Sequence, residues 1–477
     1  MVFASMLFVF FFLTANLISQ IVLKTPKAKN IAMLVFSMIF YSWGGPKYLF
    51  LLLAMVAICW VGALQVQKRE DGRERKMALI LTIALCLAIL GVFKYTGFVC
   101  STFQGIFGVP ENIPSIVLPI GISFYTFQLI SYVVDVYRKE VPAQEKYWVL
   151  LLYASLFHQC IAGPIVRYQD INQDIIRRRA TPAEISRGVS RFTVGLAKKA
   201  ILANGCAAVA DTFFDVGAAE LAAVPALGIL LAAFAFTLQI YLDFSAYSDM
   251  AIGMGLMCGF HYKENFNYPY MSTSVGEFWR RWHISLGSFF RDYVYIPLGG
   301  NRCAVPRQVL NLFVVWFLTG LWHGASWNFV LWGLYFGLLI GLERFLLKDK
   351  LDRIPLPLKG VGVFILVLFS WILFKFTDFE LLGIAVKGLF GLNGNGFTGA
   401  AVGLAFKNNL FFLVFSTIAC FPVGKMVRNI LGNLSRQNTA FFWVNAVWEA
   451  AHPVILLLLS AMALAGDSYN PFLYFQF

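Results

Sequence analysis

Charged residues are scarce in this chain. They make up 13% of its 477 residues, whereas a soluble domain typically carries about 25%. Apolar runs of roughly 20 residues, each long enough to cross a bilayer, recur from one end of the sequence to the other. The composition therefore excludes a soluble globular protein and predicts an all-α polytopic integral membrane protein, with residues 1–477 in a single domain.

Motifs typical of metal sites and of several hydrolases are also missing. The eight cysteines are scattered, with no Cys-x-x-Cys pair, which indicates small buried side chains rather than a zinc site or a disulfide framework. The sequence contains no HExxH, no paired histidines at metal spacing, no GxSxG elbow and no P-loop. We therefore expect no bound metal and no bound cofactor.

The basic residues are divided unevenly between the loops that separate the apolar runs. We expect twelve membrane spans, at residues 2–23, 31–42, 47–65, 77–95, 115–136, 191–214, 224–243, 308–323, 327–346, 357–376, 407–424 and 441–465. Every lysine and arginine then lies on one side except Lys47, Lys94, Lys375, Lys387 and Lys407. Because basic loops stay in the cytoplasm, both termini are predicted outside, and the net charge of +13 requires no nucleic-acid partner.

Two further apolar segments, residues 148–166 and 245–258, adjoin loops assigned to the cytoplasmic side. We predict that both are re-entrant, entering the bilayer and returning on the same side. Irregular backbone at that depth is tolerated only against protein or a water-filled cavity. The re-entrant segments thus indicate an internal funnel open to the cytoplasm.

The stretch GEFWRRWHISLGSFFRDYVYIPLGGNR, residues 276–302, carries charges among aromatic side chains. As a helix over 278–293 it would gather its aromatic residues and His283 on one arc, and its arginines, among them Arg280, on the other. This pattern is typical of an amphipathic helix at the membrane interface, with lipid against its polar side. His283 is then either a core histidine bonded to a carbonyl or a residue that faces a reaction path.

A second histidine lies at a break between two apolar helices. His323 ends the run NLFVVWFLTGLWH, and Gly-Ala-Ser interrupts the helix before WNFVLWGLYFGLLIGLER. An ionisable residue at membrane depth is costly and usually faces a polar cavity or a reaction. A histidine there can accept a proton from a hydroxyl near neutral pH, so we predict that His323 is catalytic. The alternative is a packing histidine with Asn328 beside it.

Two other polar groups are candidates for substrate binding. Asp243 opens the cluster DFSAYSD between apolar runs, where it either shapes a cavity or contacts a substrate, and we expect Arg280 or Arg281 to be its partner. Arg167 follows a helix-breaking Gly-Pro pair. Its guanidinium suits phosphate binding at a cytoplasmic mouth, although a lipid contact is the equal alternative.

The segments FWRRWHISLGSFFRDYVYIPLGGNR and GLWHGASWNFVLWGLYFGLLIGLER resemble the membrane-bound O-acyltransferase superfamily, in the branch of bacterial alginate and cell-wall polysaccharide O-acetyltransferases. The likeness extends over nearly the whole chain, with core motifs in 241–347 and a C-terminal helix and tail in 441–477. Such proteins usually have proline at the position of His158, so the role of His158 stays open.

The resemblance implies membrane helices around a central tunnel in a bacterial inner membrane. The acyl donor would be acetyl-CoA, and the acceptor an extracytoplasmic polysaccharide, served by a periplasmic acetyltransferase partner. His323 and His283 would line the tunnel. We expect substrate binding at Arg167, Asp243, Arg280, Trp282, Trp322 and Asn328.

The tail NPFLYFQF resembles the C-terminal motif of the small partner protein of teichoic-acid D-alanylation, in which a tyrosine is proposed to accept the acyl group. By that likeness Tyr474 would relay the acyl group, with His323 as its base; the alternative is a packing anchor for the last helix. Two other functions stay open for the chain. One is a channel or secondary transporter, and the other an acyltransferase that acts on lipids or proteins.

Overall fold

A computed structural model describes residues 2–108, 116–160 and 163–466 of the chain. These residues form helices joined by turns and irregular segments, with no β-strand among them. The all-α prediction is therefore confirmed. By packing, the chain divides into two units. The first comprises Met1–Phe192, Ser248–Glu264 and Arg291–Tyr293, and the second Thr193–Tyr247, Asn265–Phe290 and Val294–Phe477.

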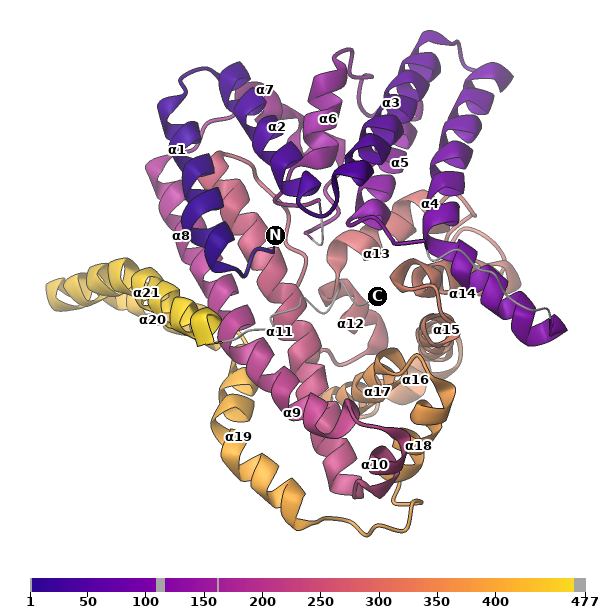
Figure 1. Ribbon diagram of the computed structural model, residues 1–477, viewed down its shortest axis with the longest axis vertical. Helices are drawn as coiled ribbons and strands as arrows, with labels where there is room; N and C mark the ends of the chain where they lie inside the picture. The colour runs from indigo at the N-terminus through magenta and orange to yellow at the C-terminus, as the bar shows by residue number, and fades with distance from the viewer. Residues whose placement is uncertain (1, 109–115, 161–162, 467–477) are drawn as a thin grey trace. The chain divides into compact units, whose positions relative to one another are not determined.

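The first unit contains the N-terminal helices. Their bounds are Leu7–Leu13 (η1), Thr14–Val22 (α1), Pro26–Ser42 (α2), Pro46–Lys68 (α3), Arg73–Phe107 (α4), Ile122–Tyr137 (α5), Tyr147–Ser155 (α6), Tyr168–Arg177 (α7) and Pro182–Ala197 (α8). Helices α3, α4 and α5 pack against one another, and α6 packs against α2 and α3 (Figure 1). The predicted re-entrant segment 148–166 begins as the short buried helix α6, and its helical conformation ends at Ser155.

The second unit contains the remaining helices. Their bounds are Lys198–Ala203 (η2), Asn204–Phe214 (α9), Ala218–Ala223 (α10), Ala226–Cys258 (α11), Pro269–Met271 (η3), Val275–Arg281 (α12), Ile284–Phe290 (α13), Arg291–Tyr295 (η4), Val305–His323 (α14), Trp327–Leu342 (α15), Glu343–Leu347 (η5), Lys348–Leu351 (α16), Leu356–Lys375 (α17), Phe379–Leu389 (α18), Ala400–Ala419 (α19), Val423–Ser435 (α20) and Thr439–Gly466 (α21). The end of α11 and the start of η4 belong to the first unit, and the end of α8, from Thr193 on, belongs to the second. Helices α14 and α15 form the most extensively packed pair.

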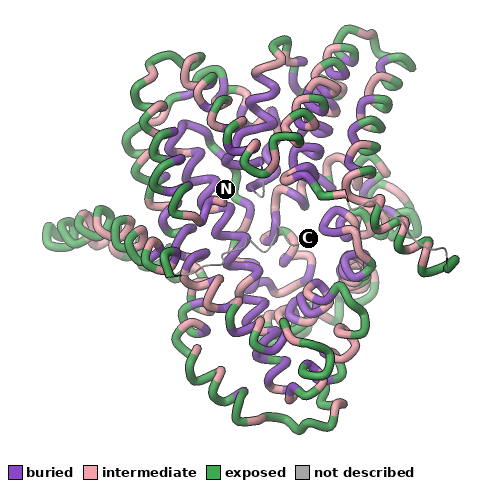
Figure 2. The backbone as a smooth tube through the Cα atoms, viewed as in Figure 1, coloured by how far each residue is buried: buried purple, intermediate pink, exposed green. Residues whose placement is uncertain are grey.

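Each predicted span overlaps a helix, although stretches within them, among them residues 2–5, 116–121 and 420–422, are not helical. Among the described residues, nine helices are long and apolar enough to cross a membrane. The other three predicted spans, 2–23, 31–42 and 115–136, correspond to the shorter helices η1–α1, α2 and α5. Figure 2 shows α11 buried along most of its length and α21 largely exposed. In their most apolar windows, 78% of the residues of α11 and 11% of those of α21 are buried inside the protein.

The prediction of a re-entrant segment at 245–258 is wrong. Helix α11 runs without interruption from Ala226 to Cys258. The acidic residues along this helix have partners that are distant in the sequence: Asp243 lies 2.9 Å from the Lys199 ammonium, and Asp249 accepts from Arg191 at 2.8 Å. Because these pairs satisfy the charges, the helix continues through the cluster.

The prediction of one helix over 278–293 is also wrong. Helix α12 starts at a capping box, in which the Ser274 hydroxyl accepts from the Glu277 N–H at 3.0 Å and the Glu277 carboxylate accepts from the Thr273 N–H at 2.9 Å. The helix then stops at a kink, where His283 adopts a φ of +44°. The Ile284 N–H there donates to the Asn265 carbonyl oxygen at 2.9 Å, instead of bonding within a helix.

Candidate active site

His323 is held at the tip of a helical hairpin formed by α14 and α15. The helices approach closely because glycines face the opposite backbone. A Cβ atom on Gly320 would lie 2.4 Å from the Phe329 carbonyl oxygen, and one on Gly333 would lie 2.3 Å from that of Trp316. Small residues allow such close helix packing in membranes. The predicted break after His323 is confirmed.

Aromatic side chains surround the imidazole of His323, which is 5% exposed. Its ring lies edge-to-face against Trp332, Trp322 and Phe374, at centroid distances of 4.8, 5.0 and 5.6 Å. The amide nitrogen of buried Asn328 donates to the Phe374 carbonyl oxygen at 3.2 Å. Asn328 therefore braces α15 against α17, the helix that contributes Phe374 to this aromatic wall.

His283 lies in the kink between α12 and α13 and is fully buried. Its Nδ1 is 3.2 Å from Asn265 Oδ1, and its ring packs edge-on against Phe244 at 4.7 Å. Burial lowers the pKa of His283 to about 3. The imidazole is therefore neutral at physiological pH and can accept a proton. The prediction that His283 points into the protein is confirmed, although the helix that suggested it is broken.

Trp322 brings the two histidines into one site. Its indole centroid lies 5.7 Å from that of His283 and 5.0 Å from that of His323. The wall continues through Trp371, which lies 4.9 Å from Trp282. The structure thus brings together four of the predicted site residues, His283, His323, Trp282 and Trp322, all in the second unit.

Asp243 does not pair with Arg280 or Arg281, so that prediction is wrong. Its buried carboxylate lies 2.9 Å from the ammonium of Lys199, while Arg281 binds Glu277 at 2.8 Å in the next turn of α12. Arg280 is exposed, and the described residues offer it no ion pair. Lys199 lies in η2 and belongs to the second unit, as does the part of α11 that carries Asp243.

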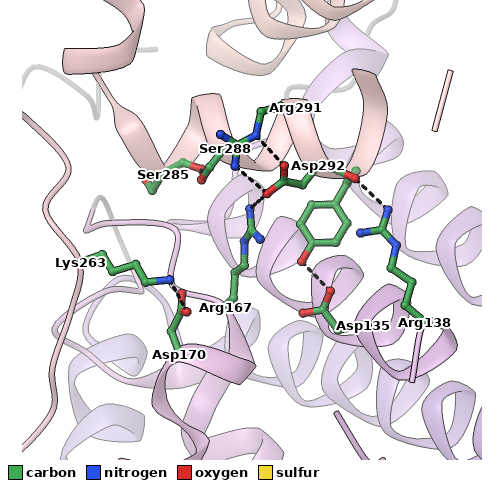
Figure 3. Close-up of polar contacts among 10 residues, drawn as sticks. Asp135, Arg138, Arg167, Asp170, Lys263, Ser285, Ser288, Arg291 and Asp292 are labelled. Atoms are coloured by element: carbon green, nitrogen blue, oxygen red, sulfur yellow. Dashed lines mark hydrogen bonds and ion pairs between the residues drawn. The ribbon is translucent and has the colours of Figure 1, made fainter. Parts of the chain in front are cut away.

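Arg167 belongs to an ionic cluster in the first unit (Figure 3). Its guanidinium donates to the Asp292 carboxylate at 2.6 Å, and Arg138 donates to the Asp292 carbonyl oxygen at 2.8 Å. Both guanidinium groups lie over the ring of Tyr293, at 5.0 and 5.1 Å. The Tyr293 hydroxyl in turn donates to Asp135 at 2.6 Å.

Asp292 is ionised within this cluster. Burial alone would raise the pKa of Asp292, but hydrogen bonds from Arg291 and Arg167 hold that pKa below its usual value. Asp292 is therefore a carboxylate at neutral pH. The cluster contains three arginines, Asp292 and Asp135, with Glu140 acting on Asp135, and the Arg291 side chain is 63% exposed. Arginines in such a cluster can bind an anion, and Arg167 is one of them.

Two other residues singled out from the sequence lie elsewhere. His158 is fully buried in the first unit, with its Nδ1 3.2 Å from the Tyr262 hydroxyl. Burial lowers the pKa of His158 to about 3, so this histidine is neutral as well. Tyr474 lies outside the described residues.

Sequence reasoning missed several residues that form the site. Trp371 and Phe374 lie within an apolar run, where an aromatic side chain gives no sign that it faces protein rather than lipid. Asn265 lies in NFNYP, a composition typical of loops. Lys199 could have been found from the sequence, because a lysine beside an apolar helix requires a carboxylate partner.

Comparison with known proteins shows where these residues fall in a family. Residues 146–348 match the family model described as MBOAT, membrane-bound O-acyltransferase family. The probable alginate O-acetylase AlgI of Pseudomonas aeruginosa is 35% identical to this chain, over 100% of both sequences. The chain belongs to the membrane-bound O-acyltransferase family. The region that matches the family model contains both histidines of the aromatic site.

More distant relatives of this membrane-bound O-acyltransferase carry related names. The peptidoglycan O-acetyltransferase of Helicobacter pylori is 32% identical over 83% of this chain and 80% of its own. The teichoic acid D-alanyltransferase of Bacillus subtilis is 27% identical over 57% of this chain and 70% of its own. The protein is therefore an acyltransferase, rather than a channel or a transporter.

Proposed function

We propose that this enzyme moves an acetyl group from acetyl-CoA to hydroxyl groups of an extracytoplasmic polysaccharide. The relatives named for O-acetylation of alginate and of peptidoglycan align with all or most of the chain, which supports an acetyl group and a glycan acceptor. The observation that carries the proposal is the pair of buried histidines, His283 and His323, which contact one indole, that of Trp322. A sugar hydroxyl is a weak nucleophile and needs such a base.

The proposed reaction balances without a metal or a redox cofactor. His323 takes the proton of the accepting hydroxyl, that of Tyr474 in the relay or that of the sugar in direct transfer, while the hydroxyl oxygen attacks the thioester carbonyl carbon. A C–O bond forms, the C–S bond breaks, and the departing thiolate takes a proton. The products are an O-acetyl ester and the free thiol of CoA. His283 positions the donor or transfers the proton to the sulfur.

The aromatic wall contributes to this chemistry by excluding water. The imidazole of His323 is 5% exposed and lies edge-to-face against Trp322, Trp332 and Phe374. Water that entered would hydrolyse the thioester in competition with transfer. Holding donor and acceptor together in a dry site also replaces a collision between two reactants by a single oriented complex.

The direction of transfer follows from the proposed topology. The one-sided distribution of lysine and arginine supports a bacterial inner-membrane protein with both termini outside and the donor in the cytoplasm. The arginine cluster around Arg167 is our candidate for the phosphates of acetyl-CoA, with Asp243, Arg280 and Asn328 as further substrate contacts. A periplasmic transferase partner and Tyr474 would complete delivery to the glycan.

The replacement His323→Ala tests this function. The purified variant in lipid nanodiscs would receive acetyl-CoA and an oligosaccharide, and the released thiol and the acetylated sugar would be measured. Loss of a general base should lower transfer by about 10²–10⁴-fold. His452→Ala, in α21, is the matched control and should retain transfer. Equal rates for both variants at equal protein level would remove His323 as the base. Acetylation of lipid or protein in place of the sugar would reassign the acceptor.

A further inference from the structure

Asn265 contacts the imidazole of His283 through an atom that can be identified as oxygen. This atom, Oδ1, lies 3.1 Å from the backbone nitrogen of Ser285 and 2.8 Å from its hydroxyl oxygen. A backbone N–H can only donate a hydrogen bond. The side-chain atom that receives it must therefore be the carbonyl oxygen of the amide, and not its NH₂ group.

That assignment fixes the proton on the imidazole. Nδ1 of His283 lies 3.2 Å from Asn265 Oδ1, which can only accept, so Nδ1 donates. The Ser285 hydroxyl, 3.4 Å from Nδ1, has given its own hydrogen to Asn265 and can likewise only accept. In the neutral ring Nδ1 thus carries the proton and Nε2 the lone pair. Nε2 is buried and has no hydrogen-bond partner in the described part of the chain.

The same asparagine fixes the backbone at the histidine. The Asn265 carbonyl oxygen accepts from the Ile284 N–H at 2.9 Å, next to the left-handed φ of +44° at His283. A residue other than glycine adopts such a φ only where its surroundings enforce it, and such residues concentrate at functional sites. Phe244 packs edge-on against the ring at 4.7 Å and limits its rotation.

We propose that Asn265 is a positioning residue that holds His283 in its Nδ1–H tautomer, so that Nε2 is the atom that accepts or passes the proton during acyl transfer. The use of Nε2 rests on the proposed function, whereas the tautomer does not. In the part of the chain that the structure describes, no charged side chain is hydrogen-bonded or ion-paired to the ring. Asp243, which precedes Phe244 on α11, is paired with Lys199.

The first experiment observes the tautomer directly. Two-bond ¹H–¹⁵N correlation spectra of protein labelled at histidine nitrogens, in nanodiscs, would show five imidazoles, and His283→Ala would assign one of them. We expect a protonated Nδ1 and a bare Nε2 in the wild type, and a mixture of tautomers in Asn265→Ala. An unchanged Nδ1–H signal in Asn265→Ala would overturn the proposal.

The second experiment reads the pH dependence of transfer. Asn265→Asp keeps an acceptor for Nδ1–H but adds a negative charge, which favours protonated His283 and should move the acidic limb upward by about 1 pH unit or more. Asn265→Ala should lose most activity. Asn311→Ala removes another buried asparagine of the second unit, bonded to the Leu298 carbonyl oxygen at 3.1 Å, and should leave both tautomer and pH profile in place.

The two readouts separate this proposal from the function on which it rests. A protein with the expected tautomers but no transfer from acetyl-CoA would refute the proposed function and retain Asn265 as the residue that sets the tautomer. A protein active with acetyl-CoA, whose Asn265→Asp and Asn265→Ala variants kept the wild-type pH profile and rate, would refute the positioning role alone.

Discussion

The close crossing of α14 and α15 predicts that one methyl group will destabilise the hairpin that carries His323. The perturbation is Gly333→Ala. The new Cβ atom would lie 2.3 Å from the Trp316 carbonyl oxygen and 3.0 Å from the Gly320 Cα, whereas ordinary contact begins at 3.4 Å. Both neighbours are backbone atoms, so the helices themselves must separate. Gly341→Ala is the matched control on the same helix, because its Cβ would meet only Leu312, at 3.7 Å.

The control allows the magnitude to be worked out. Replacing glycine by alanine inside a helix stabilises it by roughly 0.5–1 kcal/mol, because the unfolded chain loses freedom. That contribution is common to both variants and cancels in their difference. What remains is the overpacking at Gly333, which typically costs about 1–3 kcal/mol. We therefore expect Gly333→Ala to be less stable than Gly341→Ala by that amount.

The assay is thermal unfolding in detergent, followed by intrinsic tryptophan fluorescence, with transfer activity measured on the same samples. Separation of the helices would also shift His323 relative to Trp322, so activity should fall in Gly333→Ala even well below its unfolding temperature. A Gly333→Ala protein as stable as Gly341→Ala would refute the close crossing of the two helices.

The remaining predictions concern the tail and the pH dependence of stability. Tyr474→Phe should abolish glycan acetylation with normal folding; full activity by mass spectrometry of the glycan would leave the tail as a packing anchor. His261 Nε2 lies 3.1 Å from Glu184, and its Nδ1 lies 3.2 Å from Asp174. The hydrogen bond to Glu184, and to a lesser degree that to Asp174, raises the pKa of His261. Because the pKa of His261 is higher in the folded state, protonated His261 stabilises the folded protein. This stabilisation is complete below the unfolded-state pKa of about 6.5 and is lost as the pH rises through the folded-state pKa. The melting temperature of the wild type should therefore fall as the pH rises through this range, and the melting temperature of His261→Gln should not show this fall.

The positions of the helices could be predicted because the bilayer imposes one strong rule. A segment that crosses it must be apolar and helical, so runs such as 47–65 and 357–376 indicate α3 and α17 without knowledge of their neighbours. The break at His323 could also be predicted, because Gly-Ala-Ser is a local signal. Hydropathy and helix-breaking residues therefore predict a segment's structure wherever that structure is determined by residues within the segment itself.

The two wrong predictions of backbone conformation share a physical cause. Helix α11 continues through Asp243 because Lys199, far away in sequence, neutralises it. The segment 278–293 is kinked at His283 because Asn265 supplies backbone and side-chain acceptors there. In both cases the decisive partner is distant along the chain, and periodicity along one segment contains no information about it.

The neutrality of the buried site constrains how the proposed transfer can occur. With a pKa of about 3, His283 resists holding a proton, because an imidazolium in this dry aromatic surrounding lacks solvation. A proton taken from a sugar hydroxyl must therefore move on as the thiolate leaves, rather than accumulate on a ring. Two histidines in contact with one indole fit this requirement, since His323 can accept the proton near the hydroxyl and Nε2 of His283 can take it up and pass it to the sulfur. The transfer then creates no lasting charge within the membrane, which is where such a charge would cost most.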